Sequence, residues 1–268
     1  MQNPADEGAI PAPTQALLHE VETIARRAGE AILAVYGTAF TVHGKADHSP
    51  VTEADERAEA LITPALRQLA PSWPVVAEEA FSREGAAAPG PCFWLVDPLD
   101  GTREFVARNG EFTVNIALIV EGRPVLGVVH LPVPDRLFAG WVGVGAWQVR
   151  DGVRQPIRAR PRPAAGAVVA CSRSHGEGPV LEDWLRGQQV AARAPAGSSL
   201  KFGLLACGEA DLYPRFGRTM EWDTAAGHAV LEAAGGSVCD VAGAPLRYGK
   251  PGFENPHFIA RGALGSGG

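Results

Sequence analysis

Apolar residues recur at helical spacing in two early stretches of the chain. The first predicts a helix over residues 14–36, with Thr14 as its N-cap and Gly37 at its end. Its apolar face consists of Leu17, Leu18, Val21, Ile24, Ala25, Ala28, Ile32 and Val35. The second predicts an amphipathic helix over residues 51–69, which places Asp55 in its first turns.

Short apolar runs separated by turn residues fill the middle of the chain. They predict consecutive strands near residues 39–43, 73–77, 93–96, 112–120, 125–130, 136–139 and 145–149. Glu121-Gly122 and Pro134-Asp135 supply turns between neighbouring runs. Together with the two early helices, this pattern predicts an antiparallel sheet flanked by helices, an α+β lobe.

The pattern changes after a basic, proline-rich segment at residues 158–166. Beyond it, strands and helices alternate, which is typical of an α/β layer. The predicted helices span 179–188, 198–208 and 223–235, and the predicted strands lie at 167–170 and near Val190, 211–213, Val238 and Phe258. We therefore expect an N-terminal α+β lobe over residues 1–155 and a C-terminal α/β lobe over residues 156–268, with a flexible tail after about residue 262.

The stretch 93–106, FWLVDPLDGTREFV, combines a buried strand with two acids. Four apolar residues end in Asp97, and Asp100 and Gly101 follow a proline closely. Pro98 leaves Asp97 extended and presets a turn, so the two carboxylates can fold back toward a common point. Gly101 lets the backbone approach a ligand, and the amides that follow it suit an anion.

The same letters also make an ordinary turn with an aspartate cap. Their position favours a functional role over a simple turn, because acids directly after a fully apolar strand lie near the end of a buried sheet. Carboxylates there must be hydrogen-bonded, paired or bound to metal. Arg103 and Arg108 are the nearby cations that could pair with them, and this is the main structural alternative.

Further acids stand at the boundaries of predicted elements. Glu78 and Glu79 end an apolar strand, as the acids of the central stretch do. Asp55 alone would be an ordinary helix-start acid, and Asp223, beside Thr224, would be an ordinary helix cap. Taken singly, each therefore has a structural explanation.

Composition and charge narrow the class of protein. A net charge of −6 without a block of Lys or Arg argues against a nucleic-acid polymer as partner. No apolar signal core stands at the N-terminus and no apolar run reaches membrane-spanning length, so we expect a cytoplasmic protein with no integral membrane segment. Four cysteines, Cys92, Cys171, Cys207 and Cys239, are widely spaced. This spacing indicates a reducing compartment and argues against a zinc site or a disulfide framework.

Four motifs, in this order, resemble the inositol monophosphatase superfamily of lithium-sensitive, magnesium-dependent phosphatases: VTEADE, VVAEE, WLVDPLDGT and EWDTAAG. The resemblance runs from about residue 14 to 260. Within the superfamily, the sequence most resembles the CysQ-type 3′(2′),5′-bisphosphate nucleotidases. The segments that carry this resemblance are DPLDGTREF, GSSLKF, ADLYPRFG and EWDTAAGHAVLEAAGG. Inositol monophosphatases usually continue DGT with Thr-Asn-Phe. The resemblance implies a two-lobed, layered α/β/α/β/α sandwich with the site between the lobes.

The resemblance also implies roles for individual residues. The metal ligands would be the backbone carbonyl of Leu99 and the carboxylates of Glu78, Asp97, Asp100 and Asp223. Gly101 and Thr102 would hold the phosphate with their amides, and the ligands Glu78, Leu99, Asp100 and Asp223 would contact the substrate as well. Asp55 would bond the Thr102 hydroxyl, and this pair with Glu78 would orient the attacking water.

The chemistry of these residues fits the implied cofactor. Hard oxygen ligands without His or Cys suit Mg²⁺ and argue against zinc. Five acids in one site would repel one another, and two or three divalent ions would offset their charge. Two metals about 3.5–4 Å apart stabilise both the entering and the leaving oxygen of an in-line displacement, so no covalent phosphoenzyme is expected.

Substrate choice is expected to lie in the second lobe. Lys201 and Arg215 are candidates to contact a second phosphate or the sugar, with Ser198 and Ser199 beside them. The ordinary alternatives are a solvated helix lysine and a surface ion pair. No site role is predicted for Arg218, His228 or His175.

The leading hypothesis is a Mg²⁺-dependent phosphatase that removes the 3′-phosphate of 3′-phosphoadenosine 5′-phosphate, and of its sulfated relative, in sulfate assimilation. An inositol-1-phosphate or sugar phosphate phosphatase is the alternative within the same chemistry. From another class, a silent relative could bind metal and nucleotide as a sensor, but the intact acid set argues against it. The partner would be a small phosphorylated nucleotide, and a homodimer is compatible with the sequence.

Overall fold

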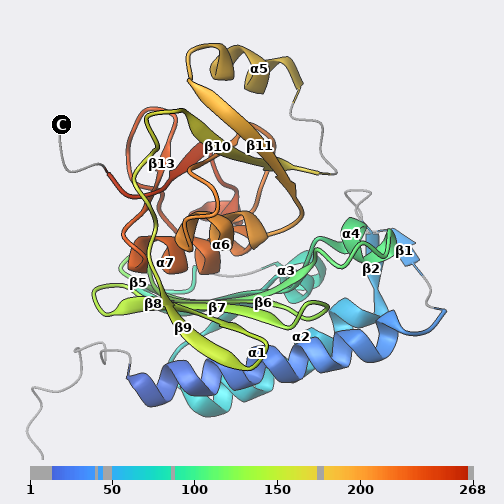
Figure 1. The fold of residues 1–268 in the computed structure, drawn as a ribbon. Coiled ribbons are helices and arrows are strands. Elements are labelled where there is room, and N and C mark those ends of the chain that lie inside the picture. Colours follow the sequence, from blue (N-terminus) through green and yellow to red (C-terminus); the bar gives the residue numbers. More distant parts are fainter. Residues whose placement is uncertain (1–13, 40–41, 45–49, 86–87, 174–177, 265–268) are drawn as a thin grey trace, which may run out of the picture.

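Alternating layers of helix and sheet build the molecule, as the computed structural model shows (Figure 1). The structure describes residues 14–39, 42–44, 50–85, 88–173 and 178–264. Two helices, a seven-stranded sheet, two helices, a five-stranded sheet and one helix follow one another in space. The layered α/β/α/β/α sandwich predicted from the sequence is confirmed.

The first layer consists of α1 (Gln15–Tyr36) and α2 (Glu53–Leu69). Thr14 caps α1 as predicted, because its hydroxyl accepts from the Leu17 amide at 3.1 Å. The second helix begins later than predicted, because Thr52 is its N-cap and the preceding residues form a strand. That strand, β2 (Pro50–Thr52), pairs with β1 (Val42–Gly44).

The seven-stranded sheet has the order β3-β4-β5-β6-β7-β8-β9. Its strands are β3 (Val75–Ala77), β4 (Cys92–Asp100), β5 (Thr113–Val120), β6 (Arg123–Leu131), β7 (Arg136–Trp141), β8 (Gly145–Arg150) and β9 (Val153–Ile157). All neighbours are antiparallel, as predicted, except that β3 runs parallel to β4. Two short helices follow its first strands, α3 (Glu78–Glu84) and α4 (Thr102–Val106).

The five-stranded sheet has the order β11-β10-β12-β14-β13 and mixed directions. Its strands are β10 (Ala167–Ser172), β11 (Val190–Ala196), β12 (Leu212–Arg215), β13 (Ser237–Asp240) and β14 (Phe258–Arg261). The helices of this half are α5 (Gly178–Arg186), α6 (Leu200–Ala206) and α7 (Ala225–Ala233), with 3₁₀ turns at Glu221–Asp223 and Pro251–Phe253. The chain passes from one sheet to the other between Ile157 and Ala167, and the predicted lobe boundary near residue 155 stays a prediction.

Helix α7 is pressed directly onto the seven-stranded sheet. Two glycines make this approach possible, because a Cβ on Gly127 would stand 2.3 Å from the Ala226 carbonyl oxygen and one on Gly140 would stand 2.6 Å from the Val230 Cα. One hydrophobic core lies between α1, α2 and this sheet, and a second lies on the opposite face, around α6 and α7. The middle layer, which consists of α6 and α7, therefore fixes where the turn before α7 lies relative to the seven-stranded sheet.

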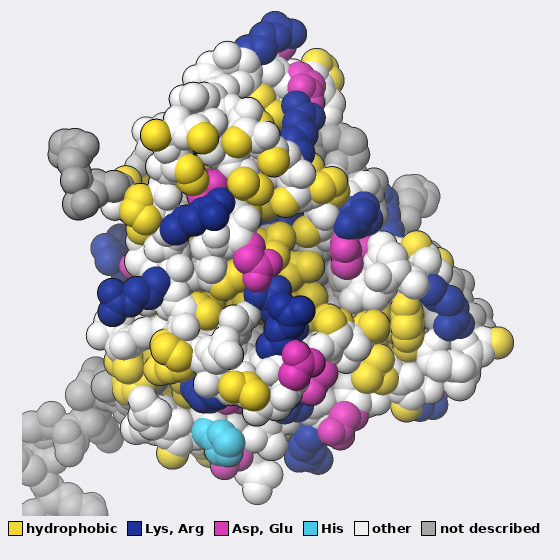
Figure 2. All heavy atoms as spheres, in the orientation of Figure 1, with side chains coloured by type: hydrophobic (Ala, Val, Ile, Leu, Met, Phe, Trp, Pro, Cys, Tyr) yellow, Lys and Arg dark blue, Asp and Glu magenta, His cyan; other side chains and the backbone are white. Residues whose placement is uncertain are grey.

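The surface carries no concentrated charge on the face that Figure 2 shows. Basic and acidic side chains are scattered there singly or beside one another, and apolar groups lie among them (Figure 2). Among the described residues, no helix has both the length and the apolar character that crossing a bilayer requires.

Candidate active site

A cavity of about 240 Å³ gathers residues from both halves of the chain. The first half contributes the start of α3, the end of β4 and the start of α4; the second contributes α6, β12 and the turn before α7. The predicted site residues that line it are Glu78, Asp100, Gly101, Thr102, Ser198, Lys201, Arg215 and Asp223. Asp55, Asp97 and Leu99 lie behind this wall, each 1% exposed.

A bulge in β4 brings Asp97 and Asp100 to one side of the sheet. Asp97 is paired with Asn115 and Asp100 with Thr113, so β4 has one residue more than β5 over this stretch. Asn115 and Thr113 are two positions apart on β5, so their side chains point to the same face of the sheet. Because of the bulge, the side chains of Asp97 and Asp100 also point to one face. The sequence predicted a turn after Asp97; instead the strand continues to Asp100, and the Asp97 Oδ1 accepts from the Leu99 amide at 3.0 Å.

Gly101 ends the strand in a left-handed conformation, with φ of 89° and ψ of 43°. A residue with a Cβ would be strained there, and its Cβ would also stand 3.2 Å from that of Ser198. This backbone reversal starts α4 at Thr102. Phosphate binding by the Gly101 and Thr102 amides stays a prediction.

Thr102 is joined to Asp55 across the cavity wall. Its hydroxyl lies 3.3 Å from Asp55 Oδ1 and 3.4 Å from the Leu99 carbonyl oxygen, and it can donate to either. The other oxygen of Asp55 accepts from the amide of Thr52 at 2.8 Å and from its hydroxyl at 2.7 Å, which completes the capping box of α2. The hydrogen bond expected between Thr102 and Asp55 is therefore present, held by the helix start, while its catalytic role stays a prediction.

Three acids face one another in the cavity. Burial raises the pKa of the Asp223 carboxyl well above its usual range, and the charges of Asp100 and Glu78 raise it further. Burial likewise raises the pKa of the Asp100 carboxyl, against the opposing influence of the Lys201 ammonium. Carboxylates with raised pKa values beside one another form a site that favours a cation. Of the predicted alternative partners, Arg108 turns away and donates to the carbonyls of Tyr36 and Thr38.

The donor set fits Mg²⁺. Carboxylate oxygens line the cavity. The Leu99 carbonyl lies just behind its wall, within hydrogen-bond distance of the lining residue Thr102. Among the described residues, no three His, Cys, Asp or Glu side chains are gathered closely enough to hold one ion between them. Mg²⁺ is usually held by one or two carboxylates together with waters and substrate phosphate oxygens, and the carboxylates of this cavity are donors of that kind. All four cysteines are free thiols.

The cations of the cavity are more buried than the sequence suggested. Lys201 is 4% exposed, and its ammonium donates to the carbonyls of Ser198 at 2.7 Å and Ala196 at 3.2 Å, so it is not a solvated helix lysine. Arg215 is 7% exposed, so it is not a surface side chain. Arg218, which received no role, also lines the cavity and pairs with Glu254 at 3.3 Å. His228 lies in α7 as expected, and His175 lies outside the described residues.

Asn115 is a site residue that the sequence analysis missed. Its amide nitrogen lies 3.4 Å from Asp100 Oδ2 and 3.0 Å from the Ser199 hydroxyl oxygen. Ser199 donates in turn to the Asp223 carbonyl at 2.7 Å, so this chain links β4 to the turn before α7. The only signal was one amide within the apolar run TVNIALIV, two positions from Thr113.

Comparisons with known proteins extend over nearly the whole chain. A model of the inositol monophosphatase family matches residues 14–262. The 3′(2′),5′-bisphosphate nucleotidase CysQ of Shigella flexneri is 49% identical over 245 residues, which cover 90% of this chain and 98% of that protein. The protein of the same name from Escherichia coli (strain K12) is 48% identical over the same shares. The crystal structure of CysQ from Bacteroides thetaiotaomicron, a bacterial member of the inositol monophosphatase family, matches with a TM-score of 0.79 at 36% identity and covers 92% of this chain and 97% of that one.

Proposed function

The chain belongs to the inositol monophosphatase family, and from this premise we propose that it is a Mg²⁺-dependent 3′-phosphatase of 3′-phosphoadenosine 5′-phosphate. The names of its CysQ relatives support the nucleotide. The observation that carries the proposal is the make-up of one cavity, in which Asp100 and Asp223 share the walls with the cations Lys201 and Arg215. A substrate with two phosphates suits such a site, because one phosphate can lie at the acids with their ions while the other meets the cations.

Glu78, Asp97, Asp100, Asp223 and the Leu99 carbonyl would hold two or three Mg²⁺ ions. When bound, these would supply Lewis acidity, lower the pKa of a water and neutralise charge on the leaving oxygen. The protein itself orients the reactants: Gly101 and Thr102 hold the 3′-phosphate, and Lys201 and Arg215 hold the far end of the nucleotide.

The Thr102 hydroxyl and Asp55 handle the proton of the attacking water. Because Thr102 can donate to Asp55, its oxygen is free to accept from a water in the cavity, and Glu78 orients that water. The water oxygen bonds to phosphorus while its proton passes through Thr102 toward Asp55. The bond from phosphorus to the ribose 3′ oxygen breaks, and this oxygen takes up a proton from a solvent water, giving AMP and phosphate. The same geometry would serve 3′-phosphoadenylyl sulfate.

Phosphate release distinguishes this function from its alternatives. The substrates are 3′-phosphoadenosine 5′-phosphate, inositol-1-phosphate and fructose-1,6-bisphosphate, each with and without Mg²⁺ and with added Li⁺. We expect the nucleotide to be preferred, with a requirement for Mg²⁺ and inhibition by Li⁺. Preference for an inositol or sugar phosphate would refute the nucleotide assignment, and nucleotide binding without turnover of any substrate would indicate a sensor.

We also propose a cytoplasmic location, since all four thiols are free. A homodimer stays a proposal, to be tested by the mass of the protein in solution.

A further inference from the structure

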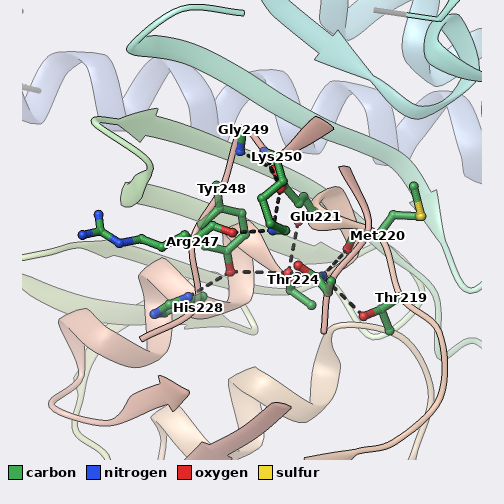
Figure 3. Close-up of polar contacts among 10 residues, drawn as sticks. Thr219, Met220, Glu221, Thr224, His228, Arg247, Tyr248, Gly249 and Lys250 are labelled. Carbon is green, nitrogen blue, oxygen red and sulfur yellow. Dashed lines mark hydrogen bonds and ion pairs between the residues drawn. The ribbon is translucent and has the colours of Figure 1, made fainter. Parts of the chain in front are cut away.

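The turn that carries Asp223 is held by a segment from farther along the chain, residues 247–255 (Figure 3). In Figure 3 the Glu221 side chain points toward Gly249 and Lys250, and the Tyr248 hydroxyl points toward Thr224. None of their contacts has a part in the chemistry proposed above. The inference that follows rests on the proposed function, because it concerns how the chain holds a proposed metal ligand.

Glu221 lies in the same 3₁₀ turn as Asp223 and is fully buried, with 0% exposure. Its carboxylate accepts from the amides of Gly249 at 2.6 Å and Lys250 at 3.0 Å, and it pairs with the Lys250 ammonium at 2.5 Å. A buried carboxylate requires such partners, and these are all supplied by the 247–255 segment. Glu221 therefore fixes the turn to that segment.

Thr224 fixes the other side of Asp223. Its hydroxyl donates to the Glu221 carbonyl at 3.1 Å and accepts from the Asn255 amide nitrogen at 3.0 Å. The Tyr248 hydroxyl lies 3.4 Å from the Thr224 hydroxyl oxygen and 2.9 Å from Nδ1 of His228. Burial raises the pKa of Tyr248, so its hydroxyl keeps the proton that it can donate.

The Asp223 carboxyl is connected to the same contacts through Met220. The Asn255 amide nitrogen donates to the Met220 carbonyl at 2.7 Å, and the Met220 amide donates to Asp223 Oδ2 at 2.8 Å. One carboxyl oxygen is thus held by a turn whose two ends are both bonded to Asn255.

We propose that Glu221 and Tyr248 are positioning residues, which set the affinity of the site for divalent ions by holding the Asp223 carboxylate in place. Neither of them lines the cavity, so neither contacts the substrate there. Partners of metal ligands act in this way in other metal sites, because they orient the ligand before the ion arrives.

The test measures ion binding directly, without substrate. Mn²⁺ is titrated into the metal-stripped full-length protein, and the free ion is followed by electron paramagnetic resonance. We expect Glu221→Gln and Tyr248→Phe each to weaken Mn²⁺ binding by about 10-fold. The matched control is Glu22→Gln, which neutralises a carboxylate that is also buried, at 6% exposure, and is paired with Arg154 at 2.8 Å on the far side of the large sheet. The control should bind Mn²⁺ as the parent does.

Parent-like Mn²⁺ affinity in both folded variants would overturn the proposal. Tyr248→Phe retains the ring, so it decides the question if Glu221→Gln does not fold. A merely structural role would lower the melting temperature and leave the half-saturating Mg²⁺ concentration for activity unchanged, whereas a positioning role raises it. A parent protein that binds Mn²⁺ and releases no phosphate would refute the proposed function alone, so the two failures are distinguishable.

Discussion

Substituting one glycine in the large sheet should displace the site without touching it. In Gly127→Ala the new Cβ would stand 2.3 Å from the Ala226 carbonyl oxygen and 2.9 Å from the Ala229 Cβ, where ordinary contact begins at 3.4 Å. Both obstacles, the Ala226 backbone and the Ala229 side chain, belong to α7, so the helix must retreat by about 1 Å. Overpacking of this kind costs about 2 kcal/mol. For a chain of this size that corresponds to a melting temperature lower by roughly 4–8 °C.

The same retreat should reduce activity, because Asp223 lies directly before α7 while Asp100 stays with the sheet. A misplacement of about 1 Å can cost about 100-fold in rate. The assays are thermal unfolding and phosphate release from 3′-phosphoadenosine 5′-phosphate at saturating Mg²⁺. Gly37→Ala is the matched control, because its Cβ would meet only the Leu33 carbonyl oxygen at 3.7 Å and its φ is −72°. If Gly127→Ala melts and turns over like Gly37→Ala, the middle layer does not set the site geometry.

Three further substitutions test separate parts of the structure. Asp97→Asn should lower kcat by more than about 100-fold with the fold retained, since its amide oxygen can still accept from Leu99, and full activity would exclude a ligand role. Lys201→Met should raise KM for the nucleotide by about 10-fold and leave KM for a simple phosphate ester unchanged; equal shifts would point to a structural role. The pKa of His130 is lowered by burial and by Arg26, against Asp135 and the Ala25 carbonyl, so its stabilising effect is full above the unfolded value of about 6.5 and is lost as pH falls through it. Urea unfolding of His130→Gln should therefore lose less stability between about pH 7.5 and about pH 5.5 than the parent, and an equal loss would contradict this.

The elements that the sequence predicted well are those whose signals are local. Helix α1 was placed to within one residue, because its apolar face and its Thr14 cap are both visible in the sequence. Strand β9 was missed because most of its residues are exposed, and an edge strand of this kind leaves no apolar run. Helix α3 was missed as well, being short and opening with two acids.

In the site, too, the features with local sequence signals were predicted and those that depend on distant contacts were not. The motifs identified which acids to consider, and Pro98 with Gly101 indicated a backbone reversal after the strand. The bulge that aligns Asp97 with Asp100 depends on pairing with β5, which no residue of β4 specifies alone. The burial of Lys201 and the bridge from Asn115 to Ser199 depend on contacts between distant segments, which single positions do not reveal.

Packing and hydrogen bonds must hold Asp100 and Asp223 together, because burial raises the pKa of both carboxyls and the charge of Asp100 raises that of Asp223 further. Left alone, the two would separate, and the turn before α7 would move away from the sheet. The close glycine contact of α7 with β6 resists this on one side, and the bonds of Glu221 to the 247–255 segment resist it on the other. The acids are thus kept near one another by packing and hydrogen bonds that precede any cation, and such preorganisation lets the binding energy of an ion appear as affinity instead of being used to assemble the site.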